Sequence, residues 1–543
     1  MATPQPVALA GSLAILASLL LVPASSSGAS ATLTENAARS HPNGPGVVKA
    51  MPHGKGNAQR GREVFRFETF GNEGFWTDAM RVPKGMLDKK ITPLQLLGTG
   101  LIIDADRIDS AMRTTLAKEL KSDLSPQKAP MLNDVKTTVK LIEANAVVGL
   151  VPKDSNRDGR IDLASGDKVG VSCAICHTVS DKSVYEMPGK GAIGKRIDGP
   201  AALVLNVGKL MAVAANSRAA YPNLQLEIGG KTIGRAPKGL RVDSTEAEVD
   251  AYLENPAFYP IGTFDETQDG HGNSVVNTPL FRQDLAAPYG SAGEFDKLDD
   301  ISNGSYTTNL DPTTLVTPEG RKFLKIKAGA AGEELANNYA KILEQTGVKG
   351  HPYVQAAMHG KPGELSNLVG RRVDNGKLLD MNAYLDALPA PRGAKVSAAT
   401  AKRGMALFRT NCTGCHNVNQ SGPVPTALVR MEEIMPGYKP EILGRRQPPL
   451  SPVQNSPGTF DDKMIVVDAS DRGEIRGNAM PLLLDLAPKQ HFLHDSSVAG
   501  LDRLLDPARG KMEPHPFYIS APTERADVVA FLKGLSISEK GKR

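Results

Sequence analysis

Apolar side chains are spread along this chain in short stretches, with one exception near the start. Val7 to Val22 is an almost unbroken apolar run, and residues 1–34 carry no charged side chain. The run is short for a membrane span, which takes about 20 residues. After it comes Ala29-Ser30-Ala31, a small-x-small pattern typical of signal-peptidase sites. We therefore predict a cleaved export signal over residues 1–31 and a flexible leader over 32–59.

Two alternatives to this prediction stay open. An export signal ordinarily has Lys or Arg before its apolar run, and Met1 to Pro6 has neither. An uncleaved anchor or a wrongly assigned start codon would explain that. No later stretch is apolar enough to cross a bilayer. We therefore expect a mature protein that is soluble in the periplasm.

Apolar residues at helical spacing form two matching pairs of segments. Residues 60–65 and 403–408 share the pattern Arg-Gly-x-x-x-Phe, which predicts a short opening helix in each half of the chain. Residues 383–388 and 530–535 share an Ala-aromatic-Leu-x-x-Leu pattern, which predicts a closing helix in each half. The Pro- and Gly-rich stretch 389–393 reads as a linker. The chain therefore has an internal repeat.

Composition limits the fold and the partners. With 543 residues, 40% hydrophobic and 23% charged, the chain is too long for one ordinary core and too apolar for disorder. Lys and Arg number 64 against 59 Asp and Glu and form no basic stripe, so nucleic acid is not an expected partner. Aromatic residues are only 5%, while 53 Gly and 39 Pro predict much loop.

All four cysteines fall in two copies of one motif, Cys173-Ala-Ile-Cys176-His177 and Cys412-Thr-Gly-Cys415-His416. Cys-x-x-Cys-His is the attachment sequence of c-type haem, in which the thiols form thioethers and the His binds iron. Two intervening residues let one helical turn present both sulfurs. A thioredoxin-like pair or a zinc site would not require the His in both copies. We predict two covalent c-type haems.

These features resemble the bacterial diheme cytochrome c peroxidase superfamily and, more remotely, the haem-containing rubber oxygenase. The stretch His491-Phe-Leu-His494-Asp495-Ser-Ser-Val498 is similar to the family's aromatic-x-His-Asp-Gly-Ser-Val segment before the last helix. The match is better over 396–543 than over the first half. The only Trp, Trp76, precedes the first haem motif, whereas the family's inter-haem Trp follows its first motif.

The resemblance implies a mainly α fold of two cytochrome c-like haem domains, with a long irregular elaboration of the first. We expect an N-terminal elaboration at 60–149 that packs on the first haem domain at 150–395. The second haem domain should occupy 396–543. In a cytochrome c fold the first and last helices cross beside the haem.

The sixth ligand of each iron decides between electron transfer and binding of a substrate. For the second haem, the longer members of the family supply a His where His515 stands, which makes His515 the first choice. The short peroxidases use a Met near there, which makes Met512 the rival. Further candidates for this position are His494, His491, Met480, Met464, Met435 and Met431.

For the first haem, no His follows His177 before His271. Candidate ligands are His359 and Met358, which stand before the closing helix, and Met187 in a loop. If none of them reaches the iron, the first haem is the one with an open position. The sequence leaves both outcomes open.

A second metal is suggested by Asp154-Ser-Asn156-Arg-Asp158-Gly159-Arg-Ile-Asp162. Oxygen side chains at alternate positions, followed by Gly, are typical of calcium loops. Position twelve is Ser165 rather than the usual Glu. A solvated turn is the alternative.

The resemblance favours a peroxidase-type oxidoreductase. One haem with two strong ligands would take electrons from a small exported donor protein, and the other would bind and reduce peroxide. The alternatives are an electron-transfer cytochrome with two six-coordinate haems, or a haem-dependent oxygenase. No catalytic acid or base can be named from the sequence.

Overall fold

The computed structural model describes part of the 543-residue chain. The described residues are 47–48, 55–233, 236–270, 272–290, 293, 295–412, 416, 426–430, 464–468, 478–479, 481–493, 496–510, 515 and 517–536. Helices predominate over strands in these ranges, as the sequence predicted, and most strands are short.

The α-helices have the following bounds: α2 (Ala58–Phe67), α3 (Val82–Asp88), α4 (Pro93–Gly98), α5 (Ser110–Glu119), α6 (Val135–Glu143), α7 (Val207–Ala212), α8 (Glu246–Glu254), α9 (Leu298–Gly304), α10 (Pro318–Gln345), α11 (Asn375–Ala387), α12 (Ala398–Asn411), α15 (Leu501–Leu504) and α16 (Pro522–Gly534). The long helix α10 is broken at Gly329, whose φ of 56° lies outside the helical range.

The strands form small sheets rather than one layer. β2 (Ile102–Asp104), β7 (Ala192–Gly194) and β6 (Tyr185–Glu186) make a three-stranded sheet, and β1 (Val47–Val48), β15 (Thr426–Arg430), β16 (Met464–Asp468) and β17 (Asn478–Ala479) make a four-stranded one. The remaining strands pair two by two: β3 (Leu150–Lys153) with β4 (Lys168–Val171), β5 (Thr178–Ser180) with β8 (Arg196–Asp198), β9 (Glu227–Ile228) with β10 (Lys231–Thr232), β11 (Thr263–Glu266) with β12 (Asn273–Val276), β13 (Ala357–Met358) with β14 (Arg371–Arg372), and β18 (His491–Phe492) with β19 (Val498–Ala499).

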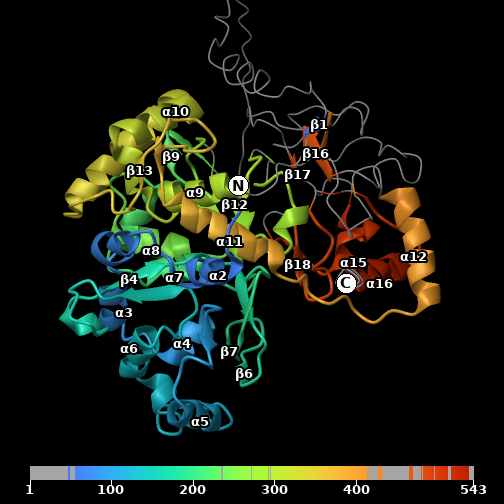
Figure 1. The fold of residues 1–543 in the computed structure, drawn as a ribbon, viewed down its shortest axis with the longest axis horizontal. Coiled ribbons are helices and arrows are strands. Elements are labelled where there is room, and N and C mark those ends of the chain that lie inside the picture. The colour runs from blue at the N-terminus through green and yellow to red at the C-terminus, as the bar shows by residue number, and fades with distance from the viewer. Residues whose placement is uncertain are drawn as a thin grey trace, which may run out of the picture.

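Two helix pairs organise the molecule, and each joins segments far apart in the sequence. α2 packs on α11, and α12 packs on α16 (Figure 1). Asn57 caps α2 by accepting from the amide of Arg60, and Ser397 caps α12 by accepting from the amide of Thr400. The predicted opening and closing helices therefore form and pair within each half.

The two pairs repeat one packing arrangement. Arg60 of α2 forms an ion pair with Asp380 of α11, with 2.6 Å between Nε and Oδ2. Arg403 of α12 forms the same ion pair with Asp527 of α16, at 2.7 Å. Ring contacts match as well, with centroids 5.8 Å apart for Phe65 and Tyr384 and 5.6 Å apart for Phe408 and Phe531. Because the corresponding residues of the closing helices occupy the same positions in both, the internal repeat extends to side-chain packing.

Three apolar clusters form the core of the described chain. The largest runs from Phe75 to Val369 and combines side chains from 60–149 with side chains from 150–395. A second cluster surrounds the α2–α11 pair, and a third lies around α12 and α16. Side chains of the segment 60–149 therefore pack against the chain that follows it. The domain boundaries stay predictions.

The short segment 482–486 links the second and third clusters. Leu484 and Leu482 pack in the cluster around α2 and α11, whereas Leu483 and Leu486 pack in the cluster around α12 and α16. Neighbouring side chains of this segment thus pack in two different clusters, one around each helix pair.

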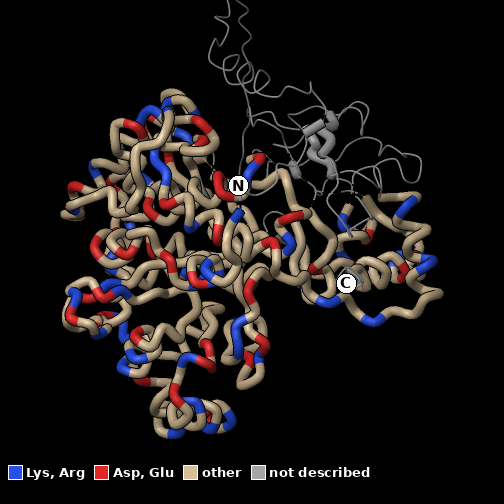
Figure 2. Tube along the Cα trace, in the orientation of Figure 1, with Lys and Arg blue, Asp and Glu red and all other residues tan. Residues whose placement is uncertain are grey.

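Acidic and basic residues are mixed over the described part of the chain in the view of Figure 2. Among the described helices, none combines the length and apolarity needed to cross a membrane.

Candidate haem sites

In both Cys-x-x-Cys-His motifs the backbone amide of the His donates to the carbonyl of the first Cys. In the first, a 3₁₀ turn begins at Cys173 directly after β4, and the amide of His177 donates to the carbonyl of Cys173 at 3.2 Å. In the second, the amide of His416 donates to the carbonyl of Cys412 at 3.0 Å, at the end of α12. Cys415 lies outside the described residues. This hydrogen bond brings the His of each motif back toward the first Cys.

His177 is oriented by a backbone carbonyl. Its Nδ1 lies 2.7 Å from the carbonyl oxygen of Thr278. A carbonyl only accepts, so Nδ1 carries the proton and the lone pair is on Nε2. Burial lowers the pKa of His177 to about 4, so the ring is neutral at ordinary pH. A neutral imidazole held at Nδ1 is the arrangement expected of a metal-binding His.

The cysteines of the first motif lie in a largely apolar setting and form no disulfide. Burial raises the pKa of Cys173 to about 11 and that of Cys176 to about 12. Redox-active Cys-x-x-Cys pairs instead have a lowered pKa on the reactive thiol. Cys173 Sγ lies 3.2 Å from the hydroxyl of the buried Tyr306 and 4.0 Å from Sδ of Met381. These surroundings do not favour the thioredoxin-like reading.

In the second half, His416 faces a second imidazole. The ring centroids of His416 and His515 are 6.3 Å apart, with 50° between the ring planes. Burial lowers the pKa of His416 to about 4 and that of His515 to about 3, so both rings are neutral. The Nδ1 atoms of both are buried and have no hydrogen-bond partner in the described part of the chain.

This spacing fits two imidazoles on one metal ion. A metal–nitrogen bond of about 2 Å on each side, plus the distance from nitrogen to ring centre, separates the ring centroids by roughly 6 Å. Of the candidates for the second haem, the structure therefore brings His515 to His416. Met512, His494 and Met480 lie outside the described residues, and His491 lies in β18.

The first half differs at the corresponding position. α11 and α16 are each 13 residues long, and His515 stands seven residues before the start of α16. Seven residues before α11 stands Leu368, a partly buried side chain that packs on the cores around it. Residues 365–370 read Leu-Ser-Asn-Leu-Val-Gly and contain no His or Met. Within the described ranges, His177 has no ring partner like the one that His416 has.

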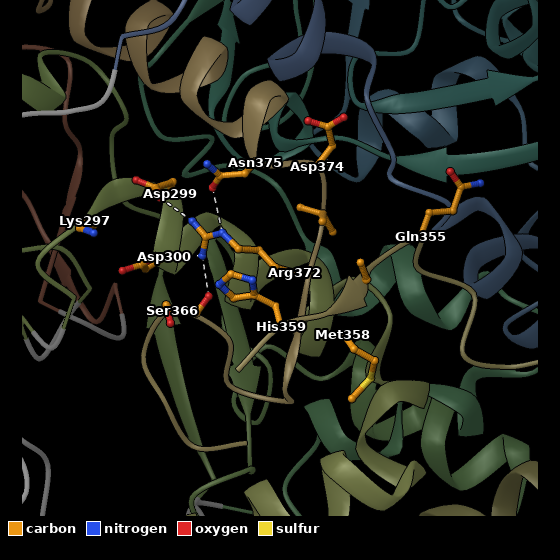
Figure 3. Close-up of a pocket in the computed structure, with 12 residues that line it drawn as sticks. Lys297, Asp299, Asp300, Gln355, Met358, His359, Ser366, Arg372, Asp374 and Asn375 are labelled. Atoms are coloured by element: carbon orange, nitrogen blue, oxygen red, sulfur yellow. Dashed lines mark hydrogen bonds and ion pairs between the residues drawn. The ribbon is translucent and has the colours of Figure 1, made fainter. Parts of the chain in front are cut away.

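His359 and Met358 lie on the β13–β14 hairpin, where both side chains are exposed, Met358 by 59%. They line an open pocket of about 620 Å³ together with the buried Arg372 (Figure 3). Arg372 pairs there with Asp299 and Asp300. Met187 is half-buried in the loop after β6. His177 is not among the residues that line the pocket of His359 and Met358.

The expected calcium loop is closed by its own backbone. Asp154 accepts from the amides of Asp158 and Gly159, and Asn156 Oδ1 also accepts from the Asp158 amide. Asp162 accepts from the amide of Ala164. Among the described side chains, no group of three or more His, Cys, Asp or Glu converges on a point that could hold a metal ion. Calcium at this loop stays a prediction.

The centre of this loop is a residue that the sequence reading missed. Asp167, only 2% exposed, accepts from the amides of Ser155, Asn156 and Asp162. These amides lower the pKa of Asp167. The loop is therefore a set of Asx-type turns around one carboxylate.

Thr278 was also missed, although a second repeat pointed toward it. Thr278 precedes Pro-Leu-Phe-Arg-Gln-Asp-Leu-Ala at 279–286, and Pro-Leu-Leu-Leu-Asp-Leu-Ala recurs at 481–487 with one residue fewer. A repeated Pro-Leu segment downstream of each motif was the available signal.

Comparison of this chain with protein-family models, with curated proteins and with solved structures finds no match to any of them.

Proposed function

We propose that this protein is an exported c-type cytochrome with two covalent haems, and that it reduces peroxide. His416 and His515 would bind the iron of the second haem from both sides. His177 would bind the iron of the first haem from one side, and the opposite side would be open to the substrate. Electrons would enter at the second haem from a small exported donor protein.

The pairing of His416 with His515 is the observation that carries the proposal. Their centroid separation of 6.3 Å is close to what two imidazoles on one iron require. Both rings are neutral, because burial lowers their pKa, and each can therefore offer a lone pair. A structural zinc site would need further converging ligands, and the described residues offer none.

The difference between the halves supports different roles for the two haems, with electron entry at the second and peroxide binding at the first. The two halves share the same helix pair, and Leu368 stands as many residues before its closing helix as His515 does before its own. A leucine side chain offers no lone pair to a metal. An iron held only by His177 would keep one exchangeable position, which favours the enzyme over a carrier with two saturated irons.

The chain contributes attachment, orientation and exclusion of water. Cys173, Cys176 and Cys412, with Cys415, would hold the two haems as thioethers. The carbonyl of Thr278 holds the proton at Nδ1 of His177, which leaves Nε2 for iron. Haem iron at an open position binds peroxide, and a second haem nearby stores the further electron that a two-electron reduction requires.

The covalent load tests the proposal directly. Mass spectrometry of the denatured exported protein should give the mass of the polypeptide plus two haems. The variant Cys173→Ser/Cys176→Ser should keep only the haem of the second motif, and Cys412→Ser/Cys415→Ser should keep only the haem of the first. The purified protein should then oxidise a reduced small cytochrome only when peroxide is added. A wild-type protein without covalent haem would refute the proposal.

A further inference from the structure

Asp198 is a buried carboxylate that joins three parts of the first half. It ends β8 and is only 6% exposed. Its Oδ2 accepts from Nε of Arg66 on α2 at 2.5 Å and from the hydroxyl of Tyr384 on α11 at 2.6 Å. Its Oδ1 accepts from the hydroxyl of Thr178 at 3.1 Å. One side chain therefore connects the crossing helices to the residue that follows His177.

The backbone beside Asp198 strengthens this connection. Thr178 and Asp198 are paired residues of the β5–β8 ladder. The next amide, that of Gly199, donates to the carbonyl of His177 at 2.8 Å. His177 is thus held at its ring by Thr278 and at its backbone by the segment 198–199.

The polar partners of Asp198 hold its carboxylate in place. Burial raises the pKa of Tyr384, so its hydroxyl keeps its proton and donates. Arg66 forms an ion pair with Asp198, and the side chains of both are mostly buried. A hydrogen-bonded carboxylate–guanidinium pair in such a setting is far more rigid than an exposed pair.

We propose that Asp198 is a positioning residue for the first haem, which fixes His177 relative to the α2–α11 pair and sets the potential of the iron that His177 binds. The proposal rests on the function proposed above. The negative charge of Asp198 stabilises the more positive, oxidised iron. Its hydrogen bond to Thr178 limits movement of the strand that begins directly after His177.

Three variants separate these roles. Asp198→Asn removes the charge and keeps the shape, whereas Tyr384→Phe removes only the hydrogen bond from α11. Asp181→Asn is the matched control, because Asp181 is an exposed carboxylate on the same side of His177 in sequence, four residues after it, that accepts from the amides of Ser183 and Lys195. For each variant, haem content, paramagnetic resonance spectra and the midpoint potential of each haem are measured.

With two haems attached, Asp198→Asn should raise the potential of the first haem and alter its spectrum, and leave the His416-linked haem unchanged. Tyr384→Phe should give a smaller spectral change, and Asp181→Asn none. Unchanged spectra and potentials in both Asp198→Asn and Tyr384→Phe would overturn the proposal without touching the proposed function. Loss of haem from the first motif alone in Asp198→Asn would assign Asp198 to folding and would also overturn it. A wild-type protein without haem would instead refute the function.

Discussion

Gly61 lies directly against the backbone of Asp380, so closely that a Cβ at this position would stand 1.9 Å from the Asp380 carbonyl oxygen. Gly404 has the same relationship to Asp527, with 2.2 Å. Each glycine sits beside the arginine that pairs with that aspartate. Close approach of the two helices therefore explains why Arg is followed by Gly in both opening helices.

Gly61→Ala and Gly404→Ala should each destabilise the half that contains them. The added methyl group would force the helices apart, and overpacking of this kind costs about 1–3 kcal/mol. Thermal unfolding followed by circular dichroism measures the effect. Gly98→Ala is the control, because nothing lies within 4 Å of a Cβ there, and it should not destabilise. Equal stability of all three variants would contradict the close-packed crossing.

The Arg60–Asp380 pair should make stability depend on pH. The hydrogen bond from Arg60 lowers the pKa of Asp380 in the folded state. The ionised Asp380 therefore contributes its full share to the free energy of unfolding above the ordinary Asp pKa of about 3.9. This stabilisation is lost as the pH falls through the lower pKa that Asp380 has in the folded state. Asp380→Asn should give a shallower loss of thermal stability below pH 4.

The control for that experiment is Asp88→Asn, which removes a carboxylate from an exposed pair with Lys84. Exposed pairs of this kind contribute little to stability. Its stability should follow the wild-type curve across the acidic range. If Asp380→Asn follows that curve too, the ion pair between the helices does not stabilise the fold.

The sequence predicted the parts of this structure that leave a periodic or repeated signal. The helix pairs were readable because Arg60 and Phe65 recur as Arg403 and Phe408, and the motif turn was readable because it is local. Thr278 could not be assigned, because a backbone carbonyl acceptor has no residue-type signature. Asp198 could not be assigned either, since its partners come from three distant segments.

The position of Leu368 shows a different limit. Its equivalence to His515 depends on the first residues of α11 and α16, which the structure gives and the sequence does not. From the sequence alone, His359 stands before its closing helix much as His515 does, because the sequence does not fix where that helix begins. The position equivalent to His515 is therefore better identified from the register of the closing helix than from the presence of a His or Met nearby.

His515→Ala should convert the second haem from low-spin to high-spin and shift its potential, because an imidazole is lost from the iron. Optical and paramagnetic resonance spectra measure both changes, and the His177-linked haem should stay as it is. Met512→Ala and His491→Ala serve as controls and should change little. A low-spin second haem in His515→Ala would transfer the role to another ligand.

Leu368→His should give the proposed first haem a sixth ligand. We expect its high-spin signal to be replaced by a low-spin one, together with a loss of at least tenfold in cyanide affinity and peroxide turnover. Leu365→His, three residues away on the same segment, should leave the signal unchanged. His359→Ala should also have no effect. A first haem that becomes high-spin only in His359→Ala would show that His359 is a ligand after all.

Paramagnetic resonance of the oxidised and half-reduced wild-type protein, before and after addition of cyanide or peroxide, tests the proposed division between the haems most directly. We expect one low-spin signal that neither cyanide nor peroxide changes, and one high-spin signal that is lost when either of them is added. Two low-spin signals in both redox states, unchanged by cyanide and by peroxide, would contradict it and leave a carrier with two saturated irons.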